Sequence, residues 1–264
     1  VFDDAVLEQL VRKVDAVINL VGVLHSRPGA AGTGWGPQFE CAHVELPRKL
    51  VRACQAAGVR RCLHMSALGA DPHAPSMYLR SKAAGEKIML EASGLEVTAF
   101  RPSVVFGAED AFLNLFAKLQ RFMPLLALGG LNAKFQPVWV QDVAQAIVTC
   151  LQDPTTAGQT YEACGPDVFT YREMMEHYAA AAGLRPRIII PVPVLTPRLS
   201  SGWVGLVTPV PYTLARRLVA SLKNEVVARN DDIRRLIPDP PAGLTTFDRA
   251  VTLALSKMRL LGLM

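Results

Sequence analysis

The stretch Asp15-Ala-Val-Ile-Asn-Leu-Val-Gly22 is a β-branched, apolar run that is stopped by a glycine. A short run of this kind, bounded by a turn residue, is typical of a buried strand. Residues 4–13 before it have the apolar spacing of a helix, and a loop rich in glycine and proline follows over 26–37. The sequence therefore predicts a helix, a buried strand and a long loop, in this order.

The same alternation continues along the chain. After the loop, the apolar spacing predicts a long helix, a strand at 61–66, a helix over 77–92 and a strand at 95–101. Strands and helices that alternate in this way are typical of a doubly wound parallel sheet. We therefore expect an α/β fold with strands 15–21, 61–66 and 95–101 adjacent and parallel. Ligands of such sheets bind beyond the carboxyl ends of the strands.

The pattern loosens after residue 110. It predicts helices over 111–122, from Asp142, over 171–182, 212–223 and 245–260, strands at 135–140 and 158–164, and a proline-rich irregular stretch over 185–212. Asp142 fits the N-terminal cap or first turn of its helix. We expect one domain over 1–150 and a smaller C-terminal lobe with a helical extension over 151–264.

Charge and composition weigh against several classes of protein. The net charge is +5, but the basic residues occur as scattered pairs such as Arg60-Arg61 and Arg234-Arg235. A nucleic-acid partner is therefore not expected, while attraction to an anionic cofactor or a membrane surface stays open. The sequence contains no run of eighteen apolar residues, and its first residues do not resemble a signal peptide.

The cysteines and histidines do not indicate a metal site. Five cysteines without a C-x-x-C pair predict reduced thiols in a cytosolic setting. Glu173 and His177 share a helix face, but two such residues are too few to hold a metal ion. We therefore expect no metal and a cytoplasmic location.

Ser66, Tyr78 and Lys82 give the sharpest chemical signal. Ser66 ends a predicted strand, and Tyr78-Leu-Arg-Ser-Lys82 opens the next helix with its tyrosine and lysine on one face. A lysine ammonium beside a phenol lowers the pKa of the tyrosine from about 10. Such a tyrosine can exchange a proton with a carbinol oxygen that the serine holds in place. The alternative is an ordinary surface helix, since Y-x-x-x-K alone is a weak motif.

This set resembles the catalytic residues of the short-chain dehydrogenases/reductases. Further stretches resemble the extended or atypical, epimerase/dehydratase-like members in the right order: Ile18-Asn-Leu-Val-Gly22, Arg101-Pro-Ser-Val-Val-Phe-Gly107 and Pro137-Val-Trp-Val-Gln-Asp142. The resemblance implies a Rossmann-like fold, NAD or NADP as cofactor, an incomplete NAD(P)-binding domain over 1–150 and a substrate lobe over 151–264. It also implies that Ser66, Tyr78 and Lys82 are catalytic. The implied cofactor contacts are Leu20, Val21, Gly22, Tyr78, Lys82, Pro102, Ser103 and Val104.

Two stretches resemble an atypical branch of that family. The run from Ser66 to Glu86 and the stretch Phe106-Gly-Ala-Glu-Asp110-Ala-Phe are similar to bacterial relatives of the nucleotide-binding accessory subunit of respiratory complex I. That subunit binds a dinucleotide and is not thought to turn it over, so the resemblance implies attachment to a protein complex or peripherally to the inner membrane. The glycine-rich strand–turn–helix with which the family begins has no match here, because Gly29-Ala-Ala-Gly32-Thr-Gly34 follows the wrong strand. We expect about sixty further residues upstream, which would choose between NAD and NADP.

Two functions stay open from the sequence, and a purely structural module ranks last. The first is an oxidoreductase or epimerase that moves a hydride between NAD(P) and a carbonyl or alcohol carbon of an unknown small molecule. The second is a non-catalytic dinucleotide-binding scaffold or redox sensor on a respiratory membrane complex. The Ser-Tyr-Lys set favours the first. Separately, the helices over 212–223 and 245–260 could carry a cationic apolar face for a membrane or partner, or pack as ordinary core.

Overall fold

The computed structural model describes residues 2–27, 29, 34–110, 120, 125–128, 130–185, 188–191, 226–230, 232–237 and 243–260. The chain groups into two compact units. The first unit comprises 1–102, 143–163 and 228–240, and the second comprises 103–142, 164–227 and 241–264. The chain thus passes between the units several times, whereas the sequence predicted a single boundary after residue 150.

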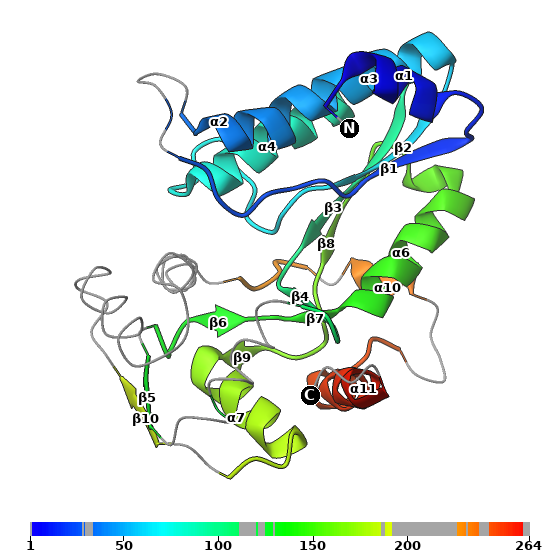
Figure 1. Cartoon of the computed structure of the whole chain (residues 1–264). Coiled ribbons are helices and arrows are strands. Elements are labelled where there is room, and N and C mark those ends of the chain that lie inside the picture. The colour runs from blue at the N-terminus through cyan, green and yellow to red at the C-terminus, as the bar shows by residue number, and fades with distance from the viewer. Residues whose placement is uncertain are drawn as a thin grey trace. The chain divides into compact units, whose positions relative to one another are not determined.

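A parallel four-stranded sheet forms the centre of the first unit (Figure 1). Its strands, in spatial order, are β1 (Ala16–Asn19), β2 (Arg61–Met65), β3 (Glu96–Pro102) and β8 (Thr160–Ala163). All neighbouring strands pair in parallel, and the register places Asn19 opposite His64. The predicted parallel arrangement of the first three strands is confirmed, and β1 lies at one end of the described sheet.

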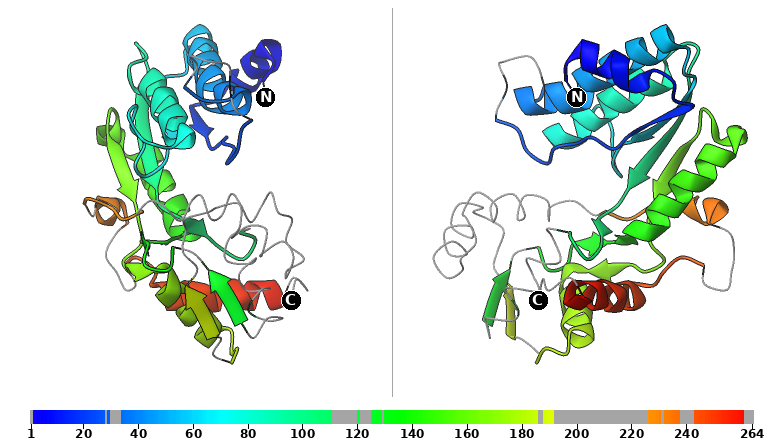
Figure 2. Two further views of the ribbon diagram at one scale, coloured as in Figure 1. Left: turned by 90° about the vertical axis from the view of Figure 1, so that its left-hand side faces the viewer. Right: turned by 45° about the vertical axis from the view of Figure 1, so that its right-hand side comes forward.

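Helices cover both faces of this sheet. Figure 2 shows α1 (Asp4–Val11), α3 (Leu46–Ala57) and α4 (Met77–Leu90) on one side and α6 (Val140–Gln152) on the other. The first layer packs Cys54 of α3 and Met89 of α4 into one apolar cluster with Cys62 of β2. On the opposite face, Arg61 donates to the carbonyl oxygen of Cys150 at 2.6 Å. The first unit is therefore a doubly wound α/β sandwich, as the sequence predicted. It is completed by η2 (Pro154–Thr156) and α10 (Ile233–Leu236).

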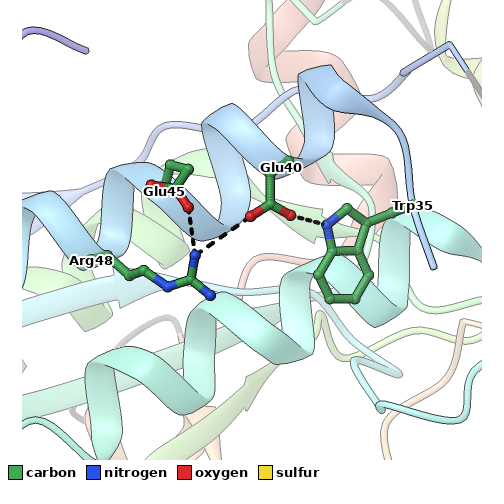
Figure 3. A network of polar contacts seen from close by, with 4 residues as sticks. All are labelled: Trp35, Glu40, Glu45 and Arg48. Atoms are coloured by element: carbon green, nitrogen blue, oxygen red, sulfur yellow. Dashed lines mark hydrogen bonds and ion pairs between the residues drawn. The ribbon is translucent and has the colours of Figure 1, made fainter. Parts of the chain in front are cut away.

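The long helix after the loop contains a π-helical stretch. α2 (Pro37–Phe39), η1 (Glu40–Glu45) and α3 follow one another without a break. Figure 3 shows the polar network on this stretch: Trp35 Nε1 donates to Glu40 at 2.5 Å, and Arg48 contacts Glu40 at 3.5 Å and Glu45 at 2.5 Å. The network ties the end of the loop to the helix. π-helical turns are rare and are frequent at functional sites.

The core of the second unit is built from aromatic rings. The ring of Phe247 lies 5.1 Å from that of Phe106 and 5.2 Å from that of Phe169. Two helices carry much of this core, α7 (Tyr171–Ala181) and α11 (Phe247–Leu260). The described strands of the unit form three pairs: β4 (Val105–Phe106) with β7 (Val138–Trp139), β6 (Lys134–Phe135) with β9 (Phe169–Thr170), and β5 (Leu125–Leu128) with β10 (Ile188–Pro191).

Several details of this unit differ from the sequence-based prediction. The strand predicted at 135–140 is two short strands on either side of Pro137, which has no N–H to donate to a ladder. Strand β10 lies inside the stretch predicted to be irregular. The carboxylate of Asp142 lies in the first turn of α6, as predicted, but it accepts the N–H and hydroxyl of Thr245 instead of capping the helix.

The C-terminal helix α11 is one of the two helices for which the sequence left open a membrane-binding or partner-binding face. The side chains of Val251, Leu255 and Met258 on α11 are buried in the second unit, and only Leu253 among its larger apolar residues is classed as exposed in the described part. The core alternative is therefore the correct one for the described side chains of this helix, up to Met258. The predicted helices over 111–122 and 212–223 lie outside the described residues, apart from residue 120.

Candidate functional site at the carboxyl edge of the sheet

Ser66 follows directly after β2, at the carboxyl edge of the sheet. Its N–H donates to the carbonyl oxygen of Phe100 on β3 at 2.7 Å. The side chain is 2% exposed, and its hydroxyl has no hydrogen-bond partner in the described structure. Buried hydroxyls are normally paired, so this one is available to a ligand or a water molecule.

Tyr78 and Lys82 lie on the first turns of α4. The ammonium of Lys82 is buried and donates to the carbonyl oxygen of Met65 at 2.5 Å. Burial lowers the pKa of Lys82 to about 8, against the opposing effect of Glu86. Burial also raises the pKa of Tyr78 to about 12.

The expected activation of Tyr78 by Lys82 stays a prediction, and the direction of the tyrosine's pKa shift is opposite to the expected one. Burial alone accounts for the direction of the tyrosine's shift, because a phenolate is costly away from water. The lysine is engaged by the backbone of β2, and no hydrogen bond joins the side chains of Tyr78, Lys82 and Ser66 among the described residues. Burial thus favours the neutral phenol of Tyr78 over the phenolate.

His43, on η1, was not predicted from the sequence. The imidazole is 2% exposed; its Nε2 accepts the N–H of Val23 at 3.0 Å, and its Nδ1 lies 2.8 Å from the hydroxyl of Ser81. Ser81 donates its own proton to the carbonyl oxygen of Tyr78, so Nδ1 must carry the imidazole proton. Burial and the charge of Lys82 lower the pKa of His43 to about 3, which keeps it neutral. Its ring lies 5.5 Å from that of Tyr78, edge to face.

His64, on β2, is a second unpredicted member of the site. Asn19 accepts the N–H of Val21 through Oδ1 at 3.2 Å, so its amide nitrogen donates to Nδ1 of His64 at 3.1 Å. The proton of this imidazole is therefore on Nε2, which is buried without a partner in the described structure. Burial, together with the charges of Lys82 and His43, lowers the pKa of His64 to about 3.

The predicted cofactor residues Leu20, Val21 and Gly22 follow β1 at the same edge. Leu20 is 58% exposed. A Cβ placed on Gly22 would lie 3.7 Å both from Nε2 of His43 and from Nζ of Lys82. The backbone at Gly22 therefore lies beside the lysine, which brings two of the predicted groups of site residues together.

The remaining predicted residues fall on both sides of the division between the units. The carbonyl oxygen of Pro102, in the first unit, accepts the N–H of Leu68. In the second unit, Ser103 donates to the carbonyl oxygen of Val226 at 3.2 Å, and Val104 accepts the N–H of Val138. Each of the three is therefore held by a hydrogen bond to a residue distant in the chain.

The described residues contain no group of three or more histidine, cysteine, aspartate or glutamate side chains placed to hold a metal ion. Glu173 instead forms a capping box with Thr170, and His177 lies 2.9 Å from Asp248. In the same part of the chain, no helix has the length and apolar character needed to cross a membrane.

Residues 1–164 match the NAD dependent epimerase/dehydratase family. The chain belongs to this family, so the resemblance to extended short-chain dehydrogenases/reductases and the Rossmann-like fold are confirmed. The cofactor class of the family is the predicted one, a nicotinamide dinucleotide. A nucleoside-diphosphate-sugar epimerase from Staphylococcus aureus has the same fold, with a TM-score of 0.71 and 16% identity over 95% of this chain and 81% of that one.

The curated relatives are more specific. The chain is 40% identical over 179 residues to NADH dehydrogenase [ubiquinone] 1 alpha subcomplex subunit 9, mitochondrial, of Arabidopsis thaliana, covering 66% of this chain and 42% of the relative. Its counterpart in Mus musculus is 35% identical over 204 residues, covering 75% of this chain and 50% of the relative. The chain thus spans about half the length of these relatives or less.

Proposed function

We propose that this protein binds NAD or NADP at the carboxyl edge of the first unit's sheet and acts as an accessory subunit of a respiratory NADH dehydrogenase. In this proposal it does not turn the cofactor over. Two relatives that carry the name of such a subunit support the assignment. The observation that carries it is the identity to these relatives, 40% and 35%. In agreement with it, Tyr78 has no hydrogen bond to Lys82, whose ammonium donates to the carbonyl oxygen of Met65.

The residues at this edge suit the nicotinamide end of a dinucleotide. The unpaired hydroxyl of Ser66 and the ammonium of Lys82 offer hydrogen-bond donors, and Gly22 lets the cofactor approach the backbone. When bound, the dinucleotide would supply a carbon that can accept or donate a hydride. Within the first unit, Leu20 and Val21 after β1 and Pro102 at the end of β3 are the candidate cofactor contacts.

The electrostatics of the site favour binding over turnover. A general acid or base works best with a pKa near the operating pH. Tyr78 lies far above that range, whereas Lys82, at about 8, would lose its proton in mild alkali. A site of this kind can hold a cofactor for structural or sensing purposes without a proton donor poised for chemistry.

The test of binding uses the full chain, titrated with NADH and NADPH and followed by ligand fluorescence and by calorimetry. We expect saturable binding of one of them. The same protein is then incubated with each cofactor and a panel of carbonyls and quinones. Turnover that is lost in Tyr78→Phe would overturn the non-catalytic proposal, and absence of binding to both cofactors would overturn the dinucleotide site.

The partner and location are tested separately. We propose a peripheral position on the inner membrane, through attachment to the NADH dehydrogenase and not through a membrane span. An affinity-tagged chain expressed in its own cells should migrate with NADH dehydrogenase activity in a native gel of membrane extract. Recovery of the chain only as a free species, with no activity at the same position, would contradict the assignment.

An NAD(P)-dependent reductase or epimerase with Ser66, Tyr78 and Lys82 as its catalytic residues is the second candidate. The observation in its favour is that all three side chains follow the carboxyl ends of strands or begin the next helix in the first unit. Its substrate contacts would come from the lobe over 151–264, with cofactor contacts from 1–150. The turnover assay above separates the two candidates.

A further inference from the structure

The segment that follows β1, residues 20–24, is held in an unusual way. It has no strand pairing in the structure, because β1 ends at Asn19. Leu20 and Leu24 are 58% and 81% exposed, so side-chain packing does not anchor its ends. Val21 and Val23 are half-buried, and their two N–H groups point to side chains of the first unit.

Each of these N–H groups donates to a chain of hydrogen-bonded side chains that contains a buried histidine. We call each chain a relay. Val21 donates to Asn19, which in turn donates to His64. Val23 donates directly to His43, which donates to Ser81 on α4. The two relays use opposite tautomers, since His64 carries its proton on Nε2 and His43 on Nδ1.

Only a neutral imidazole can play either part. A protonated histidine has no lone pair left to accept the N–H of Val23 or the amide of Asn19. Both rings are buried beside the ammonium of Lys82, which opposes a second positive charge. Both imidazoles therefore stay neutral, and the hydrogen bonds of the two relays persist, over the whole physiological pH range.

We propose that His43 and His64 are positioning residues that together fix the backbone of residues 20–24 in the conformation that receives the dinucleotide. The assignment of the ligand rests on the function proposed above. The effect on the backbone does not, because it concerns hydrogen bonds that exist without any ligand. Fixing a loop in its binding conformation before the ligand arrives removes an ordering cost from the binding step.

The first test measures hydrogen exchange at the two amides. In His43→Phe, which keeps an aromatic ring between Phe39 and Tyr78, the amide of Val23 should exchange about tenfold faster while that of Val21 is unchanged. In Asn19→Ala the effect should cross over, with Val21 accelerated and Val23 unchanged. His64→Phe should act on the Val21 amide in the same direction as Asn19→Ala. Equal acceleration of both amides in every variant, or none in any, would overturn the proposal.

Matched controls separate positioning from general loosening. His73→Phe replaces an exposed histidine of the same unit and should leave both amides unchanged. His43→Gln supplies an amide oxygen for Val23 and an amide N–H for Ser81, so it should restore most of the protection. A failure of His43→Gln to restore it, with the fold intact, counts against the relay.

A measurement on the unaltered protein covers the case in which the variants fail to fold. Long-range nitrogen–proton spectra of the imidazoles should show two rings that stay neutral at pH 6.5. One should be protonated at Nδ1 and assigned to His43, and the other at Nε2 and assigned to His64. Two rings with the same tautomer, or rings that become charged near pH 6.5, would contradict the arrangement.

The second test links the relays to binding. NADH and NADPH titrations should give a dissociation constant about tenfold higher in His43→Phe than in the unaltered chain, with recovery in His43→Gln. Unchanged affinity in a variant whose Val23 amide has lost protection would overturn the link to the ligand. If the unaltered chain binds neither cofactor, the proposed function fails while the exchange experiment still decides the role of the two histidines.

Discussion

The buried interior of the first unit near residues 20–24 differs in kind from the core of the second unit. In the second unit, rings such as Phe106, Phe169 and Phe247 pack on one another and on the apolar face of α11. Near residues 20–24, the buried side chains include two imidazoles, the amide of Asn19, the hydroxyls of Ser66 and Ser81 and the ammonium of Lys82. Packed aromatic rings stabilise the folded state by being buried, whereas buried polar groups stabilise it only when each has a hydrogen-bond partner. The aromatic core of the second unit is therefore suited to stabilising the fold, and the polar cluster of the first unit to holding a ligand.

The largest effect is expected in the aromatic core. Phe247→Ala should lower the free energy of unfolding by about 3–5 kcal/mol, because it removes a buried ring that contacts two others. Urea denaturation followed by tryptophan fluorescence measures the loss. Leu253→Ala, on the exposed side of the same helix, should change stability by less than about 0.5 kcal/mol. Similar losses in both variants would show that the ring packing is not the source of stability.

A smaller effect is expected where α4 meets the π-helical stretch. A Cβ on Gly85 would lie 2.0 Å from the carbonyl oxygen of His43, so Gly85→Ala must push the two helices apart. We expect a loss of about 1–3 kcal/mol from overpacking, although alanine in a helix is otherwise favoured by about 1 kcal/mol over glycine. Chemical denaturation measures it.

Gly22→Ala provides the matched control, since its new Cβ would meet only ordinary contacts at 3.7 Å. Its stability should stay close to that of the unaltered chain. Should Gly85→Ala prove as stable as this control, the close approach of the two helices would not constrain His43.

The third prediction concerns pH. The pKa values of His43 and His64 are about 3 in the folded chain and about 6.5 when exposed, so the unfolded chain binds more protons between these values. Stability should therefore fall as the pH drops from about 6.5 towards 3, by up to about 1.4 kcal/mol per pH unit for each histidine. Lys82 and Tyr78 face the same cluster, but their pKa values, about 8 and about 12, lie above this window.

Thermal unfolding between pH 7 and 4.5 tests this dependence. His64→Gln should show a shallower decline in melting temperature than the unaltered chain, since one of the two groups no longer titrates. His73→Gln, at an exposed position, should keep the original slope. Identical slopes in all three proteins would mean that the buried histidines do not cause the loss of stability at acid pH.

The smallest effect is expected in the surface network of Figure 3. Arg48 is 47% exposed there, and exposed ion pairs contribute between about 0 and 1 kcal/mol. Arg48→Ala should therefore lower stability by no more than about 1 kcal/mol, and less at high salt. A loss above about 2 kcal/mol in denaturation experiments would show that the network supports the π-helical stretch below it.

The strands and helices of the first unit could be predicted because their signals are local. The β-branched run at 15–21 and the apolar spacing of 77–92 each carry their own periodicity, and β1 and α4 form there. The spacing of Tyr78 and Lys82 likewise placed them one turn apart on a helix. The spacing could not show that the ammonium turns to the carbonyl oxygen of Met65, nor that burial would raise the pKa of the tyrosine.

His43 and His64 could not be recognised in the sequence. The bond from Val23 to His43 spans 20 residues, and that from Asn19 to His64 spans 45. A single histidine in an apolar run gives no signal of its partner. The alternation in β2 does place residues 62, 64 and 66 on one face, and this is the one local hint that His64 lies with Ser66.

The sequence by itself determined the order of the elements, the parallel sheet and the family, because apolar periodicity and motif spacing act over a few neighbouring residues. The tertiary structure alone decided which groups surround residues 20–24, which tautomers the two histidines adopt, and that the leucine-rich α11 is core. These outcomes depend on contacts between residues distant in the chain and on burial, which sets the cost of each charge. These contacts and this burial arise only when the sheet and its helices have come together.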